Sequence, residues 1–92
     1  MNPHLKQAVM FLHVLDNRLA GHVEDDRRAA DEGRDSGTRD GTAEAVALYT
    51  VAASMRRVLE VVRQEKEALT TFAPLVDIYT AGMMDDSRAG AA

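Results

Sequence analysis

The chain has 92 residues, a formal net charge of −4 and no cysteine. A chain of this length forms one domain with a modest core, and the lack of cysteine excludes disulfides and cysteine-ligated zinc. Acidic and basic residues are interspersed, which argues against direct binding to nucleic acid or to an anionic membrane surface. No apolar run approaches the ~20 residues of a membrane span, and no signal-peptide pattern precedes the first helix. We therefore expect a cytoplasmic protein. Fifteen alanines, and nine arginines against two lysines, would suit a GC-rich bacterial or phage genome.

The first predicted element is a long amphipathic helix over residues 3–32. Asn2 can cap its free N–H groups, and Pro3 suits the first helical position, where its missing donor is not needed. Steps of three and four residues place one apolar stripe along the helix, which is typical of a helix packed lengthwise on another: Leu5, Ala8, Val9, Leu12, Leu15, Leu19 and Val23.

Gly21 leaves two interpretations of this helix open. In the first, the helix ends near Gly21 and residues 22–41 form a charged loop. In the second, it continues to Glu32, since residues 22–32 are good helix formers with Glu24 and Arg28 at salt-bridge spacing. A structureless loop of twenty residues is uncommon inside a compact domain, so we favour the continuous helix.

A glycine-rich turn over residues 33–41 leads into a second long helix over residues 42–72. The turn segment reads GRDSGTRDG, and Asp40, Gly41 or Thr42 can cap the helix that follows it. The second helix lacks Gly and Pro, and the core positions of its apolar stripe again advance by fours and threes. The stripe contains Leu48, Val51, Ala52, Met55, Val58, Leu59, Val62 and Leu69. Two helices of matched length joined by a short turn predict an antiparallel hairpin.

Pro74 is expected to end or sharply kink the second helix, because it removes a backbone donor and clashes with the preceding turn. A short third helix over residues 74–82 would then fold over the open end of the hairpin, and residues 85–92 would form a frayed tail. The predicted fold is thus all-α, a single helical domain over residues 1–84. Two such hairpins would form a four-helix bundle, because one hairpin buries a single seam.

Two charged residues interrupt the apolar stripes. Asp16 lies at the centre of the first stripe, and a buried carboxylate is costly unless it is paired. Arg56 and Arg63 are expected about one turn to either side of it, so we predict a buried polar seam of Asp16, Arg56 and Arg63. Without a second carboxylate at matching height, an acid–base role for Asp16 has no support. Lys66 is expected to cover apolar surface with its stem while its ammonium reaches water.

Other side chains indicate surfaces rather than active sites. Several apolar residues fall outside both stripes and are expected at an interface with a second copy or another protein: Met10, Phe11, Val14, Val61 and Phe72. The acidic run Glu24, Asp25 and Asp26 is a candidate contact for a basic partner. His4, His13 and His22 are too far apart on one helix to share a metal ion, so we predict neither metal nor cofactor.

These patterns favour a non-enzymatic interaction or adaptor module that forms a helical homodimer and binds another protein. The alternative is a small all-helical dimeric enzyme that binds an anionic metabolite between its helices, with inward-facing cations such as Arg18, Arg56, Arg63 and Lys66. The sequence contains no catalytic, nucleotide or metal motif that favours the alternative.

Overall fold

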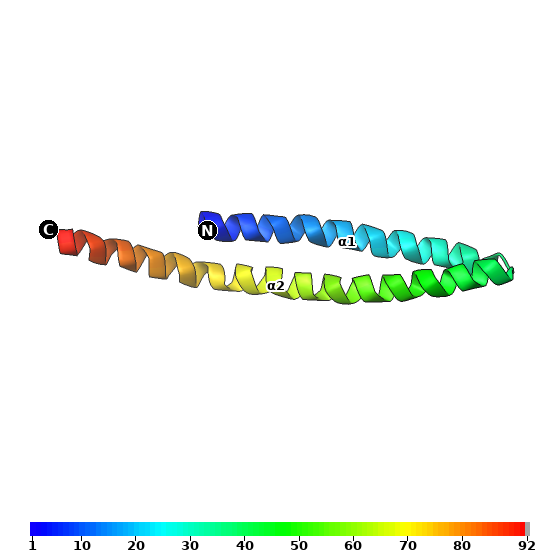
Figure 1. The fold of residues 1–92 in the computed structure, drawn as a ribbon. Coiled ribbons are helices and arrows are strands. Elements are labelled where there is room, and N and C mark those ends of the chain that lie inside the picture. Colours follow the sequence, from blue (N-terminus) through cyan, green and yellow to red (C-terminus); the bar gives the residue numbers. More distant parts are fainter. Residues whose placement is uncertain (92) are drawn as a thin grey trace.

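The computed structural model is a hairpin of two antiparallel helices, α1 (Pro3–Asp35) and α2 (Arg39–Ala91) (Figure 1). It describes the backbone of residues 1–91 and the side chains of residues 1–83. Over that part of the chain all regular structure is helical, which confirms the all-α prediction. The hairpin is a thin rod with principal extents of 79 × 14 × 13 Å. Its two termini lie toward one end and the turn lies at the other (Figure 1).

α1 begins where the sequence predicts and continues past Gly21 without a break. The Asn2 side chain accepts a hydrogen bond from the His4 backbone N–H at 2.8 Å, and Pro3 is the first helical residue. Residues 22–32 are helical throughout. The continuous-helix interpretation is therefore confirmed, and the helix extends three residues past its predicted end, to Asp35.

The turn is shorter than predicted and comprises only residues 36–38. Gly37 takes φ = +70°, a conformation that suits glycine. The Thr38 hydroxyl accepts a hydrogen bond from the Gly41 backbone N–H at 3.0 Å and so caps α2. The predicted caps Asp40, Gly41 and Thr42 are instead inside α2, because the cap at Thr38 lets the helix begin at Arg39.

Pro74 does not end α2, and the separate third helix over residues 74–82 is absent. The helix contains Pro74 and runs as one gently curved ribbon beyond the N-terminus of α1 (Figure 1). Proline removes one backbone hydrogen bond, and the exposed position of Pro74 allows its ring to face solvent. The final residues therefore extend away from the hairpin rather than covering its open end. The predicted tail over residues 85–92 falls within the last turns of α2, except for Ala92, which lies outside the described residues.

The two helices meet along residues spaced seven apart, which we call the central row. On α2 the central row is Ala45, Ala52, Leu59, Lys66 and Ala73, and on α1 it is Val9, Asp16, Val23 and Ala30. A seven-residue repeat is the spacing that keeps two helices in contact along their length. Most of its buried members are small, and Ala30 is completely buried. The helices are therefore packed through small side chains over much of their length.

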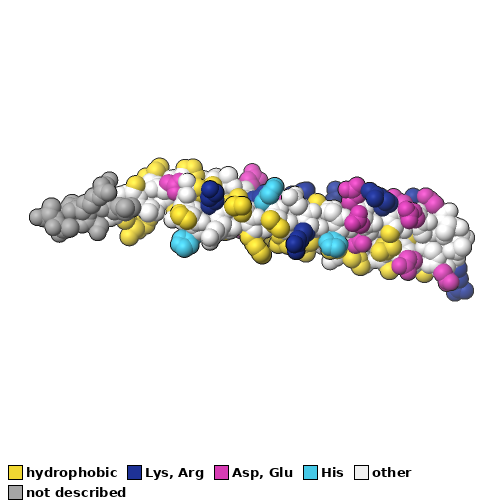
Figure 2. All heavy atoms as spheres, turned by 90° about the horizontal axis from the view of Figure 1, so that it is seen from above, with side chains coloured by type: hydrophobic (Ala, Val, Ile, Leu, Met, Phe, Trp, Pro, Cys, Tyr) yellow, Lys and Arg dark blue, Asp and Glu magenta, His cyan; other side chains and the backbone are white. Residues whose placement is uncertain are grey.

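Charged side chains are unevenly distributed along the rod. On the face shown in Figure 2, acidic and basic groups gather over the half that contains the turn, while apolar groups are more frequent toward the open end. The half near the turn is thus the more polar part of this face.

Candidate interaction surface

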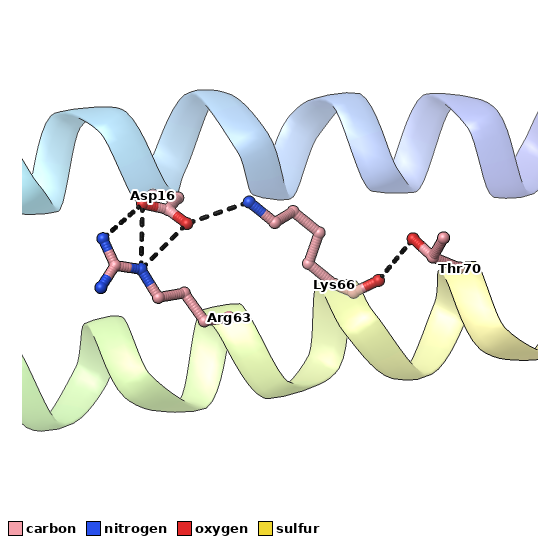
Figure 3. A network of polar contacts seen from close by, with 4 residues as sticks. All are labelled: Asp16, Arg63, Lys66 and Thr70. Carbon is pink, nitrogen blue, oxygen red and sulfur yellow. Dashed lines mark hydrogen bonds and ion pairs between the residues drawn. The ribbon is translucent and has the colours of Figure 1, made fainter.

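The one buried charged residue among the described side chains is Asp16, which joins the two helices near the middle of the hairpin (Figure 3). Its carboxylate accepts hydrogen bonds from Arg63 Nε at 3.2 Å and from Lys66 Nζ at 3.0 Å. The Thr70 hydroxyl donates to the Lys66 backbone carbonyl at 2.9 Å. Two of the three residues of the predicted polar seam, Asp16 and Arg63, are therefore in contact, and Lys66 joins them although the sequence analysis did not assign it to the seam.

Arg56 does not belong to this cluster, and the direction of the side chains explains why. A helical side chain leans toward the N-terminus of its own helix. Arg63 and Lys66 consequently lean toward the turn, whereas Asp16 on the antiparallel helix leans toward the open end, so the three groups converge. Arg56 leans away from Asp16, and it forms no ion pair with any described residue. The Lys66 ammonium binds Asp16, a contact that the sequence analysis did not predict.

The two cations hold Asp16 in its ionised form. The hydrogen bonds from Arg63 and then from Lys66 lower the pKa of the Asp16 carboxyl below its usual value of 3.8, although desolvation acts in the opposite direction. A carboxylate with a lowered pKa and two fixed donors is poorly suited to exchange protons near neutral pH. The cluster is thus a structural link between the helices.

One side of the hairpin carries a polar groove between the two helices, in the half nearer the turn. Tyr49 at this side donates a hydrogen bond to the Asp31 carboxylate, and that bond raises the pKa of the Tyr49 hydroxyl. The groove is lined by charged residues from both helices: Glu24, Arg27, Arg28 and Asp31 from α1, and Arg56, Glu60 and Arg63 from α2.

The opposite side carries large apolar residues, and we call it the apolar face. Each of its members comes three or six residues after a position of the central row in the sequence. In an antiparallel pair of helices, such positions of both helices lie on the same side of the seam. On α1 they are Leu5, Ala8, Leu12, Leu15 and Leu19, and on α2 they are Leu48, Val51, Met55, Val58, Val62, Leu69, Phe72, Val76, Tyr79 and Met83. Glu65 is the one charged residue within the α2 part of this face.

The hairpin buries alanines together with Val23, Leu59 and Val62, and leaves many of its other large apolar residues accessible. Ala45, Ala52 and Ala73 are each at most 3% exposed, whereas Val58 is 50% and Phe72 is 57% exposed. No large side chain among those described is fully buried. A stable core normally buries its large aliphatic and aromatic groups, which contribute most of the hydrophobic free energy. The apolar face is therefore the surface of this hairpin that most resembles an uncovered core.

The five predicted interface residues are all exposed, but the hairpin does not bring them together. Phe72 belongs to the apolar face, while Met10 lies beside Val9 and His13 in a groove on the opposite side. All five are more than half exposed: Met10, Phe11, Val14, Val61 and Phe72. Sequence analysis missed most of the apolar face because it assigned Leu48, Met55, Leu69 and their neighbours to the seam within the hairpin.

The acidic run Glu24, Asp25 and Asp26, predicted to contact a basic partner, is only partly free to do so. Glu24 pairs with Arg28 at 3.2 Å, Asp25 is exposed and Asp26 is half-buried. Across the described side chains, no three potential ligands among His, Asp and Glu come close enough to hold a metal ion.

Comparisons with known proteins returned no matching family model, no matching curated protein and no matching solved structure. Over the part of the chain that the structure describes, neither helix has a stretch both long and apolar enough to cross a lipid bilayer.

Proposed function

We propose that this protein is a non-enzymatic interaction module, in which the apolar face of one hairpin packs against the same face of a second copy. The observation that carries the proposal is the small core of the hairpin: four alanines are among its seven buried apolar residues, while Val51, Val58, Phe72, Tyr79 and Met83 of the apolar face are exposed. Packing two apolar faces together gives a four-helix bundle whose interior contains the large residues.

The solvent-accessible area of the hairpin is large enough for it to bury a dimer interface. The hairpin exposes 7028 Å², whereas a compact monomer of its mass, 10.0 kDa, would expose about 5,200 Å². The excess is about 1,800 Å² per chain, which falls within the range that each subunit of a permanent dimer buries. The radius of gyration of 21.8 Å also exceeds the about 12 Å expected for a compact chain of this length.

The dimer would leave the polar groove and the acidic turn end facing solvent. We propose that another protein binds there, since charged rims steer partners and set specificity, while Asp25 and the unpaired Arg56 offer both signs of charge. In this proposal the apolar face holds the module together and the outer surface recognises the second partner.

Multi-angle light scattering after size-exclusion chromatography tests the dimer directly. We expect twice the chain mass for the native protein and a monomer for Val58→Glu, because the new carboxylate would replace an apolar side chain of the apolar face and be buried without a partner. Val46→Glu is the matched control, since Val46 is also exposed on α2 but lies seven residues from Ala53, on the side of the polar groove. A folded native monomer, or equal effects of both variants, would contradict the proposal.

A further inference from the structure

The apolar residues of the two helices are centred at the same height of the rod. On α2 they extend from Leu48 to Met83, with a midpoint close to Lys66. On α1 they extend from Leu5 to Leu19, with a midpoint at Leu12. Leu12 lies one turn nearer the open end than Asp16, whose carboxylate contacts Lys66. Both midpoints therefore fall at the level of Lys66, so a single two-fold axis can pass through both.

We propose that the second copy lies antiparallel to the first, with the turns at opposite ends and the axis near Leu12 and Lys66. This inference rests on the proposed dimer and specifies its geometry. Each α1 packs on the partner's α1, and each α2 packs on the partner's α2. Three pairs of large residues of the α2 row then meet: Val51 opposite the partner's Met83, Met55 opposite the partner's Tyr79, and Val58 opposite the partner's Val76.

This arrangement gives a neighbour to the part of α2 that extends beyond the N-terminus of α1. Asn2 donates its backbone N–H to Asp77 at 3.0 Å, which places the beginning of α1 level with Asp77. Tyr79 and Met83 lie beyond that level, so α1 of the same chain does not run beside them, and Figure 1 shows α2 continuing past the N-terminus of α1. In the antiparallel dimer these two residues cover the partner's α2 near its turn.

The same arrangement accounts for the apolar residues of α2 near the turn. Val51, Met55 and Val58 remain apolar, although the corresponding row of α1 becomes polar at Asp26, seven residues after Leu19. A dimer with both turns at one end would place these residues beside the polar part of the partner's α1. It would also leave Tyr79 and Met83 beyond both first helices. The antiparallel dimer instead gives both uncovered segments of α2 an apolar neighbour.

Spin labels distinguish the two arrangements, because the chain has no native cysteine and each introduced cysteine is the only thiol. Asp35→Cys places a label at the exposed end of α1, next to the turn. With turns at opposite ends, each label lies 23 residues from the axis at Leu12, so the two labels of a dimer lie about 70 Å apart at 1.5 Å per residue. With turns at one end, they lie within about 30 Å, the width of a four-helix bundle.

A second label, at Glu65→Cys, lies close to the proposed axis. Two such labels are expected within about 15 Å of each other, so their continuous-wave spectrum should be broadened, and mixing with excess unlabelled protein should remove the broadening. A long distance at residue 35 together with broadening at residue 65 supports the antiparallel dimer. A short distance at residue 35, or an unbroadened spectrum at residue 65, in a particle of dimer mass overturns this arrangement alone. A monomer mass overturns the proposed dimer itself.

Discussion

At the residue scale, the ion pairs of Asp16 should make stability depend on pH. Asp16→Asn keeps the size of the side chain but removes the charge that Arg63 and Lys66 bind. We expect the variant to unfold at lower urea concentration than the native protein at pH 7. Because the folded-state pKa of Asp16 lies below 3.8, the contribution of its charge is fully present above that pH.

The difference between the native protein and Asp16→Asn should shrink as the pH falls from about 4 through the lowered pKa of Asp16, where both states bind the proton. Urea unfolding measured at several pH values checks this, and Asp25→Asn is the control because Asp25 is exposed. A difference that stays constant down to the lowest pH at which the protein folds would contradict the assigned role.

The sequence predicted Asp16 as a buried carboxylate and Arg63 as its partner, because both follow from spacing along amphipathic helices. It did not predict that Lys66 binds Asp16. A helical wheel gives the direction of a side chain around the helix axis but not its tilt along that axis. The lean toward the helix N-terminus separates Lys66 and Arg63, which reach Asp16, from Arg56, which does not. Lys66 lies seven residues from both Leu59 and Ala73, and this spacing could have identified it as a residue of the seam.

At the element scale, α1 and α2 approach most closely beside the turn, where two glycines face each other. A Cβ atom at Gly33 would lie 2.6 Å from the Gly41 carbonyl oxygen, whereas a Cβ atom at Gly21 would meet nothing within 4 Å. We therefore expect Gly33→Ala to lower the free energy of unfolding by about 1–3 kcal/mol. Gly21→Ala should raise it by about 0.5–1 kcal/mol, since alanine is the better helix former.

Urea unfolding of the two variants, each at the same protein concentration, measures this contrast. Both substitutions replace glycine by alanine within one helix, so helix propensity alone would stabilise both. If both variants are stabilised equally, the helices do not approach closely at Gly33, and the close packing of Gly33 against Gly41 described above is contradicted.

The helices themselves could be predicted from the sequence better than their ends. The start of α1 followed from Asn2 and Pro3, whose roles are local. The end of α2 did not, because the sequence analysis treated Pro74 as a stop. A proline costs one hydrogen bond and a kink, and α2 nevertheless continues through it. The glycines of the turn likewise predicted the position of the reversal but not that residues 36–38 would suffice.

At the scale of the whole molecule, dimerisation should couple stability to protein concentration. If folding and association occur together, a tenfold rise in concentration stabilises the dimer by about 1.4 kcal/mol. We therefore expect the thermal unfolding midpoint to rise steadily over a dilution series followed by circular dichroism. The midpoint of Val58→Glu should be independent of concentration, and a constant midpoint for the native protein would contradict association through the apolar face.

The sequence predicted that a single hairpin leaves apolar groups exposed, and the five residues it named are exposed, but it assigned most of the apolar face to the seam within the hairpin. Two helices with apolar stripes wider than one seam can meet along either edge of the stripe. Alanines at positions 30, 45, 52 and 73 allow a close approach along one edge, and many of the larger side chains, such as Val51, Val58 and Phe72, then remain outside. Choosing between the edges requires comparing packing in three dimensions, which spacing along the chain does not provide.

The short turn also sets an order in which the hairpin can form. Gly33 and Gly41 are close in sequence, whereas the hydrogen bond between Asn2 and Asp77 spans 75 residues. Closing a short loop costs less chain entropy, so contacts beside residues 36–38 can form first and pairing can then proceed toward the termini. The ends of the helices join last and separate first. We expect amide hydrogen exchange to be slowest near the turn in an isolated hairpin, and to slow at the opposite end only when the second copy binds.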